Sequence, residues 1–118
     1  FLRQRMANVY NYPLGYWAIT KQYAPDEFLG WVMLLPVDDE DPTVEIGWRL
    51  IRAAWGQGIG TEAVRKMIEV IGHQMPEAKT IAAIHPENTG SIKLAEKAGM
   101  VFEREEIIDG AAERIYRC

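Results

Sequence analysis

The segment Trp55-Gly56-Gln57-Gly58-Ile59-Gly60-Thr61 is the most informative part of the sequence, because it separates a strand-like pattern from a helical one. Residues 43–51 before it alternate between two faces, which predicts a half-buried strand. Residues 63–75 after it repeat apolar side chains at helical spacing, which predicts an amphipathic helix over 58–75. The glycines remove Cβ atoms that would keep an anion away from the backbone. The first N–H groups of that helix would therefore face the turn, which favours a phosphate or pyrophosphate there.

The spacing of these glycines excludes two common nucleotide-binding loops. A Walker A loop has a lysine and then a serine or threonine after its last glycine, whereas Gly60 is followed by Thr61 and Glu62. A dinucleotide loop has the spacing G-x-G-x-x-G, but the sixth position counted from Gly56 is Thr61. The turn therefore belongs to neither class.

The same turn resembles the acyl-CoA loop of the GNAT acetyltransferase superfamily, (Gln or Arg)-x-x-Gly-x-(Gly or Ala) at a strand-to-helix junction. It departs from that pattern at Trp55, where Gln or Arg is usual. The run from Trp55 to Ala63 is similar to the branch that includes the ribosomal-protein N-acetyltransferases. The resemblance implies acetyl-CoA as cosubstrate, no metal, and a diphosphate bound by the main chain of Gln57, Gly58, Ile59, Gly60 and Thr61.

A second block, His85-Pro86-Glu87-Asn88-Thr89-Gly90-Ser91 and the helical run after it, resembles the Asn-x-x-Ser, helix, Gly-Phe segment of the same family. Asn88 is a good N-cap, and Gly99 is placed to end the helix, although Met100 replaces the common Phe. The resemblance implies that Asn88 contributes to cofactor binding. Two motifs in the family's order are harder to obtain by chance than one glycine loop.

Composition limits the class of protein. With 118 residues and 48% hydrophobic side chains, the chain is expected to form a single domain over residues 1–118. The net charge of −4 and the lack of a dense Lys/Arg cluster argue against nucleic acid as a partner. The single Cys118 cannot form an internal disulfide, and the sequence shows no signal peptide or long apolar run. We therefore expect a cytoplasmic protein that does not bind membranes.

The expected fold class is α/β, the GNAT fold, with a mixed, largely antiparallel twisted sheet flanked by helices. The expected strands cover residues 16–22, 28–35, 43–51, 80–85, 100–108 and 112–116, and the expected helices cover 58–75 and 88–98. Residues 1–13 are interpreted as a loop or the end of a helix. The resemblance implies that the chain is truncated and lacks the family's N-terminal strand and helices. An edge strand at Tyr16 would then be free to pair with another chain, so a homodimer is a possible assembly.

Acetyl transfer needs a base that takes a proton from the amine, and Glu45 is the candidate. The resemblance supports it, because GNAT histone acetyltransferases keep a general-base glutamate at the corresponding strand position. Apolar neighbours Val44 and Ile46 would raise its pKa. Alternation alone also predicts a polar residue at this position, on the solvent side of a half-exposed strand, so the structural reading stays open.

The thioester carbonyl needs hydrogen-bond donors as its oxygen gains charge. The resemblance implies that these are backbone amides of residues 48–51 in a splayed strand, with Leu50 and Ile51 among the cofactor contacts. Many family members protonate the leaving thiolate with a tyrosine seven residues after the asparagine, but that position is Ala95 here. Ser91 is the proposed substitute, with a first-turn helix cap as the alternative.

The predicted function is an N-acetyltransferase that moves an acetyl group from acetyl-CoA to a primary amine by direct attack in a ternary complex. The acceptor is a protein N-terminus or a small molecule. One rival is a non-catalytic acyl-CoA-binding or regulatory module, which the missing tyrosine favours. Another is a phosphate-loop protein that binds a different nucleotide.

Overall fold

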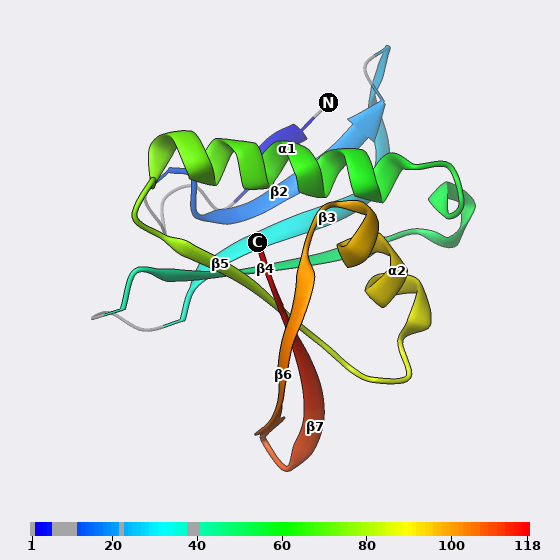
Figure 1. Ribbon diagram of the computed structural model, residues 1–118. Coiled ribbons are helices and arrows are strands. Elements are labelled where there is room, and N and C mark those ends of the chain that lie inside the picture. The colour runs from blue at the N-terminus through cyan, green and yellow to red at the C-terminus, as the bar shows by residue number, and fades with distance from the viewer. Residues whose placement is uncertain (1, 6–11, 22, 38–40) are drawn as a thin grey trace.

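The computed structural model describes residues 2–5, 12–21, 23–37 and 41–118, and only the backbone of residues 2–5 and 25 (Figure 1). The described strands form one sheet of seven, in the order β1-β2-β3-β4-β5-β7-β6. The strands are β1 (Leu2–Arg5), β2 (Gly15–Lys21), β3 (Ala24–Pro36), β4 (Thr43–Leu50), β5 (Lys79–Ile84), β6 (Val101–Ile108) and β7 (Ala111–Arg117). All neighbouring pairs are antiparallel except β4 and β5. The mixed, largely antiparallel α/β architecture predicted from the sequence is confirmed.

Helix α1 (Ile59–Gln74) lies across one face of the sheet, and α2 (Thr89–Lys97) lies near the N-terminal end of α1 and contacts β5 (Figure 1). The alternation of β4 directs Val44 and Ile46 toward α1, where they meet the helix stripe that includes Val64 and Met67. All four side chains are at most 1% exposed, so the core lies between α1 and the sheet. Both helices are within one residue of the predicted bounds at each end.

The N-terminal prediction was wrong where the structure tests it. Leu2–Arg5 forms a strand that pairs antiparallel with β2, with Leu2 opposite Ile19 and Arg5 opposite Tyr16, rather than a loop or a helix end. A four-residue segment with one apolar side chain shows no periodicity that would predict a strand. The strand forms because the backbone of these residues pairs with the edge of β2. Because β2 is covered, its edge is not available for a homodimer. The remaining residues of that predicted segment up to 11 lie outside the described part of the chain.

The parallel strands β4 and β5 stay paired over only a short distance. Their register runs from Thr43 opposite Lys79 to Glu45 opposite Ile81, and it ends there. Beyond that point β4 continues beside β3, and β5 continues beside β7. The sheet therefore opens between the C-terminal halves of β4 and β5.

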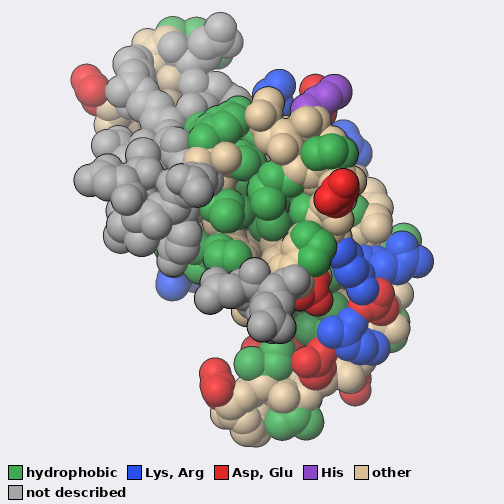
Figure 2. Space-filling model, turned by 90° about the vertical axis from the view of Figure 1, so that its left-hand side faces the viewer, with side chains coloured by type: hydrophobic (Ala, Val, Ile, Leu, Met, Phe, Trp, Pro, Cys, Tyr) green, Lys and Arg blue, Asp and Glu red, His purple; other side chains and the backbone are tan. Residues whose placement is uncertain are grey.

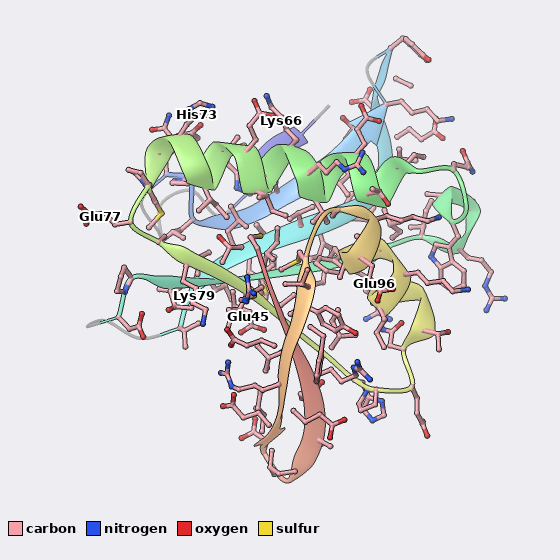
Figure 3. The ribbon with its side chains drawn as sticks, viewed as in Figure 1. Glu45, Lys66, His73, Glu77, Lys79 and Glu96 are labelled. Atoms are coloured by element: carbon pink, nitrogen blue, oxygen red, sulfur yellow. The ribbon has the colours of Figure 1, made fainter. Side chains whose placement is uncertain are left out.

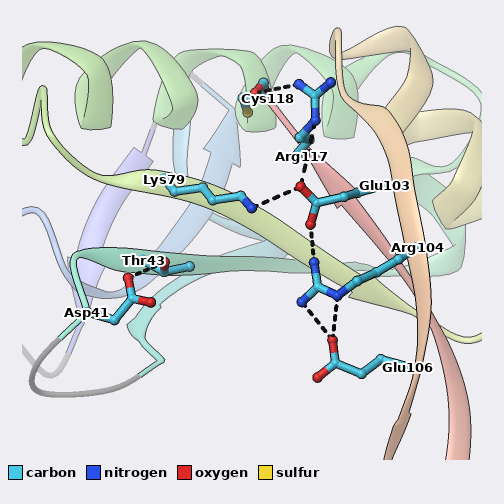
Figure 4. Close-up of polar contacts among 8 residues, drawn as sticks. All are labelled: Asp41, Thr43, Lys79, Glu103, Arg104, Glu106, Arg117 and Cys118. Carbon is cyan, nitrogen blue, oxygen red and sulfur yellow. Dashed lines mark hydrogen bonds and ion pairs between the residues drawn. The ribbon is translucent and has the colours of Figure 1, made fainter.

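A charged cluster ties β5 to the C-terminal hairpin (Figure 4). Glu103 accepts a hydrogen bond of 2.9 Å from Lys79, also pairs with Arg104, and lies 3.8 Å from Arg117. Arg104 continues the chain to Glu106 at 2.7 Å. The three surrounding cations lower the pKa of Glu103, with the Lys79 hydrogen bond as the main cause. Figure 2 shows Lys and Arg side chains mixed with Asp and Glu side chains. The described residues on the face drawn there therefore form no patch of a single sign.

Candidate functional site

The glycine turn reverses the chain between β4 and α1. After the short 3-10 turn η1 (Arg52–Ala54), Gly56 and Gly58 have φ of +72° and +75°, and a Cβ on either would meet no atom within 4 Å. The left-handed φ explains glycine at both positions. Trp55 fixes the turn by donating from Nε1 to the carbonyl of Leu50 at 3.1 Å, and Gln57 by donating from Nε2 to the carbonyl of Ala53 at 2.7 Å. The Gln57 side chain thus points back to η1.

Among the described residues, the amides at the start of α1 have no protein partner. Gly58 is the N-cap residue and has no side chain to accept a hydrogen bond. The first backbone bond in this turn is from the amide of Glu62 to the carbonyl of Gly58, at 3.0 Å. Within the described residues, no group accepts a hydrogen bond from the amides of residues 57–61. These donors and the positive end of the helix dipole are available to an anion.

A groove of about 1610 Å³ runs along this end of α1 and on to the start of α2. Its walls include Leu50 and Gly58 to Thr61, whereas Gln57 and Ile51 are not among its lining residues. At Gly60 the elements are so close that a Cβ would lie 2.6 Å from Cδ1 of Leu94 and 2.8 Å from Cδ1 of Leu50. The glycine therefore also allows α1 to approach α2 and β4.

Ile51 is placed differently from the other predicted cofactor contacts. It is 40% exposed, and its amide donates to the carbonyl of Leu29 at 2.9 Å. That N–H group is therefore already used within the protein. Trp48 and Leu50, by contrast, line the groove.

The second predicted motif forms the far wall of the groove. Asn88 is the N-cap of α2, and its Oδ1 accepts a hydrogen bond of 3.1 Å from the amide of Ser91. This leaves the Nδ2 group of Asn88 and the hydroxyl of Ser91 without a partner among the described residues. Ala95, at the position of the family's tyrosine, is 0% exposed and packs in the core.

A second, smaller cavity of about 240 Å³ opens where β4 and β5 separate. Glu45 lines it, and Figure 3 shows Glu45 near the crossing of these strands, on the side of β4 away from α1. Burial raises the pKa of Glu45, and the nearby carboxylate of Glu113 raises it further. The cavity and the groove share four lining residues, Trp31, Trp48, Asn88 and Ser91. The two spaces therefore meet at Ser91, with the α1 amides on one side and Glu45 on the other.

Two residues of this arrangement were missed by sequence reasoning. Trp31 comes from β3 and Glu113 from β7, and strand pairing places both on the cavity that Glu45 lines. Neither residue lies in a sequence motif that marks it as part of a site. The alternation of residues 111–117 would have placed Glu113 and Ile115 on one face, but it does not show which cavity that face meets.

The described residues contain no group of three or more His, Cys, Asp or Glu side chains that could hold a metal ion. Likewise, none of the helices in this part of the chain has the length and apolar character needed to cross a bilayer.

Comparison with known proteins agrees with this geometry. Residues 1–101 match the family model of the acetyltransferase (GNAT) domain. The uncharacterized protein YkkB of Bacillus subtilis (strain 168) is 35% identical over 98 residues, which cover 82% of this chain and 56% of that protein. The fold is that of an α/β domain, and the family match identifies its class. The chain belongs to the GNAT acetyltransferase family.

Solved structures show the same fold. The acetyltransferase from Agrobacterium tumefaciens str. C58 superposes with a TM-score of 0.78 at 21% identity, covering 96% of this chain and 65% of that one. The microcin C7 self immunity acetyltransferase MccE, solved in complex with acetyl-CoA and AMP, gives a TM-score of 0.67 at 26% identity and covers 78% and 54%. The chain spans little more than half the length of YkkB and of MccE.

Proposed function

We propose that this chain transfers an acetyl group from acetyl-CoA to a primary amine, by direct attack in a ternary complex. The acceptor is a protein N-terminus or a small-molecule amine. The observation that carries the proposal is the row of amides at residues 58–61, which have no partner among the described residues and open on a groove that leads to Glu45. The run from Trp55 to Ala63 favours the ribosomal-protein branch of the family.

The cofactor would lie with its diphosphate on the first turn of α1. Gly58 supplies no Cβ there, so the oxygens can reach the amides of Ile59, Gly60 and Thr61. Basic side chains at the rim, Lys93 and Lys97, add positive charge near the adenosine phosphates. From this anchor the pantetheine arm would run past Leu50 and Asn88 toward the gap between β4 and β5.

At that gap the acceptor amine would meet the thioester. Most amines arrive as ammonium ions at neutral pH, and the Glu45 carboxylate accepts one proton. The free amine then attacks the thioester carbonyl, the C–S bond breaks, and the thiolate takes the second proton from nitrogen. Glu45 releases its proton to solvent. A raised pKa makes Glu45 a stronger base than an ordinary glutamate.

The second proton transfer is proposed to pass through the Ser91 hydroxyl. Ser91 lines both cavities, and its hydroxyl is not used in capping α2, because the cap bond is made by its amide. The backbone amides of Trp48 and Leu50 would face the developing oxyanion, since the Ile51 amide is bonded to Leu29 and the Arg49 amide, two residues earlier on β4, faces β3 in the same way.

Titration calorimetry with acetyl-CoA, ATP and NADH tests the cofactor. Acetyl-CoA is expected to bind tightly and the two nucleotides weakly, since the loop lacks the features of their sites. A CoA-release screen over a panel of amines then tests turnover. Equal binding of all three ligands would contradict the cofactor assignment.

The alternative is an acyl-CoA-binding or regulatory module without turnover. It is favoured by Ala95, which is fully buried where the family's proton donor is expected. Glu45→Gln distinguishes the two, because an enzyme would lose turnover while its affinity for CoA stays the same. Silence across the amine panel, with acetyl-CoA bound, would support the module.

Location and assembly are also proposals. The single Cys118 suits a reducing cytoplasm, and no nucleic acid or membrane partner is proposed. Since β1 covers β2, the described sheet has its edges at β1 and β6, and we propose β6 for a homodimer contact because Val101 is 47% exposed and Ile107 is 71% exposed there. Sedimentation velocity of Ile107→Lys against the unsubstituted protein tests this edge. An unchanged sedimentation coefficient would argue against it.

A further inference from the structure

The groove and the second cavity differ in the charge of their walls. The groove is lined by five cationic side chains, Arg49, Arg65, Lys66, Lys93 and Lys97, and by three carboxylates, Glu62, Glu69 and Glu87. Cations therefore outnumber carboxylates among its lining side chains. The ionisable side chains of the second cavity are Glu45, Glu113 and His85, and no described Lys or Arg lines it. The groove therefore suits a polyanion, and the second cavity suits a cation.

Glu113 carries a carboxylate oxygen that the protein does not satisfy. Its Oε2 is enclosed, and no described group donates a hydrogen bond to it. Its neighbour Arg114 does not neutralise it, because successive strand residues point to opposite faces. The Arg114 guanidinium lies over the Phe102 ring, 4.3 Å from its centroid. An enclosed carboxylate oxygen without a donor is costly, so a ligand that donates to it gains affinity.

Aromatic side chains line the same cavity. Trp31 and Trp48 are both half-buried, and both face the junction between the cavity and the groove. Tyr16 holds Trp31 edge-on, with 5.5 Å between ring centroids. Indole faces attract ammonium groups, and the attraction strengthens when water is excluded.

The two carboxylates cannot have the same task if Glu45 is the base. Glu45 must lie by the amine that reacts and loses its charge, whereas the unsatisfied oxygen of Glu113 is best matched by a donor that remains cationic. We infer that the second cavity accepts an amine with two amino groups, and that Glu113 binds the ammonium that stays charged while the other amine faces Glu45. This inference rests on the proposed function, and it assigns Glu113 as a specificity-determining residue.

Binding measurements test the inference without turnover. The protein is saturated with CoA and titrated with 1,4-diaminobutane and with 1-aminobutane, which differ by one amino group. The diamine is expected to bind about tenfold tighter, as for a partly buried ion pair. Glu113→Gln should bring the ratio close to one, and Glu113→Asp should restore part of it. Glu105→Gln, on the exposed neighbouring strand and outside both cavities, should leave the ratio unchanged.

Equal affinity for the two amines in the unsubstituted protein would overturn the inference, and so would an unchanged preference in Glu113→Gln. CoA release separates this failure from failure of the proposed function. If the diamine binds in a Glu113-dependent manner and no CoA is released, acetyl transfer fails and the cation site stands. If both amines release CoA equally and Glu113→Gln changes neither, transfer stands and the inference fails.

Discussion

Gly58→Ala tests the central claim, that main-chain amides at the start of α1 bind the diphosphate of acetyl-CoA. Gly58 has φ of +75°, and its Cβ would meet nothing within 4 Å, so the substitution causes no clash. The left-handed conformation alone costs an alanine about 1 kcal/mol of folding free energy. Gly110 in the β6–β7 turn has φ of +81° and equally open surroundings, so Gly110→Ala carries the same cost far from the groove.

The two variants should therefore lose equal stability and differ only in binding. A new Cβ at Gly58 lies where the phosphate would approach the amides, and one lost hydrogen bond to a charged group is worth about 1.5–3 kcal/mol. The expected loss of acetyl-CoA affinity is thus about tenfold to a hundredfold for Gly58→Ala and none for Gly110→Ala. Urea unfolding measures the first quantity and titration calorimetry the second.

Pantetheine sharpens this comparison, because it lacks the diphosphate. Its affinity should be the same in both variants and in the unsubstituted protein. The reasoning is refuted if Gly58→Ala binds acetyl-CoA as tightly as Gly110→Ala does. It is also refuted if Gly58→Ala weakens pantetheine as much as acetyl-CoA, since the effect would then not come from phosphate.

Three further predictions concern Glu45, Gly60 and Glu103. Glu45→Gln should remove the acidic limb of the profile of turnover rate against pH. In the unsubstituted protein we expect this limb at a pH above the usual glutamate pKa. Because burial raises that pKa in the folded state, the ionised carboxylate lowers stability above it, and the variant should be at least as stable at neutral pH in thermal melts. Gly60→Ala should lower the free energy of unfolding by about 1–3 kcal/mol, because the new Cβ overpacks against Leu94. Gly72→Ala, in open space on the same helix, should raise it by about 0.5–1 kcal/mol. Destabilisation by both substitutions would contradict the role of the Gly60–Leu94 contact. Glu103→Gln should lower the melting temperature at neutral pH, and this effect should disappear as the pH falls through the lowered pKa of Glu103. A lower melting temperature that persists in acid would show that the ion pairs of Glu103 are not the cause.

The parts of the fold that the sequence predicted well have a long periodic signal. The α1 pattern spans sixteen residues, and its glycine turn supplies an independent start, so both ends are close to the prediction. Strand β3 was predicted as 28–35 but begins at Ala24, because its early residues pair with β2 across two register shifts and do not alternate cleanly. The short β1 had no local signal at all.

The site was predictable only where one segment contains it. The amides of residues 57–61 lie within a single motif, and the cap from Asn88 to Ser91 lies within another. Trp31 and Glu113 come from strands that meet β4 and β5 through pairing, so no spacing in the sequence relates them to Glu45. The opening between β4 and β5 is a property of the main chain, and the side chains give no sign of where it begins.

The topology explains why one helix, and not both, is suited to hold an anion. Because β4 and β5 are parallel, their C-terminal ends lie at the same end of the sheet, and α1 and α2 both begin there. Asn88 caps α2 with its own side chain, so part of that N-terminus is already satisfied. Gly58 leaves the N-terminus of α1 without such a cap. We therefore expect an anion at this end of the sheet to bind α1, with the start of α2 as the wall that directs the rest of the ligand toward the gap beside Glu45.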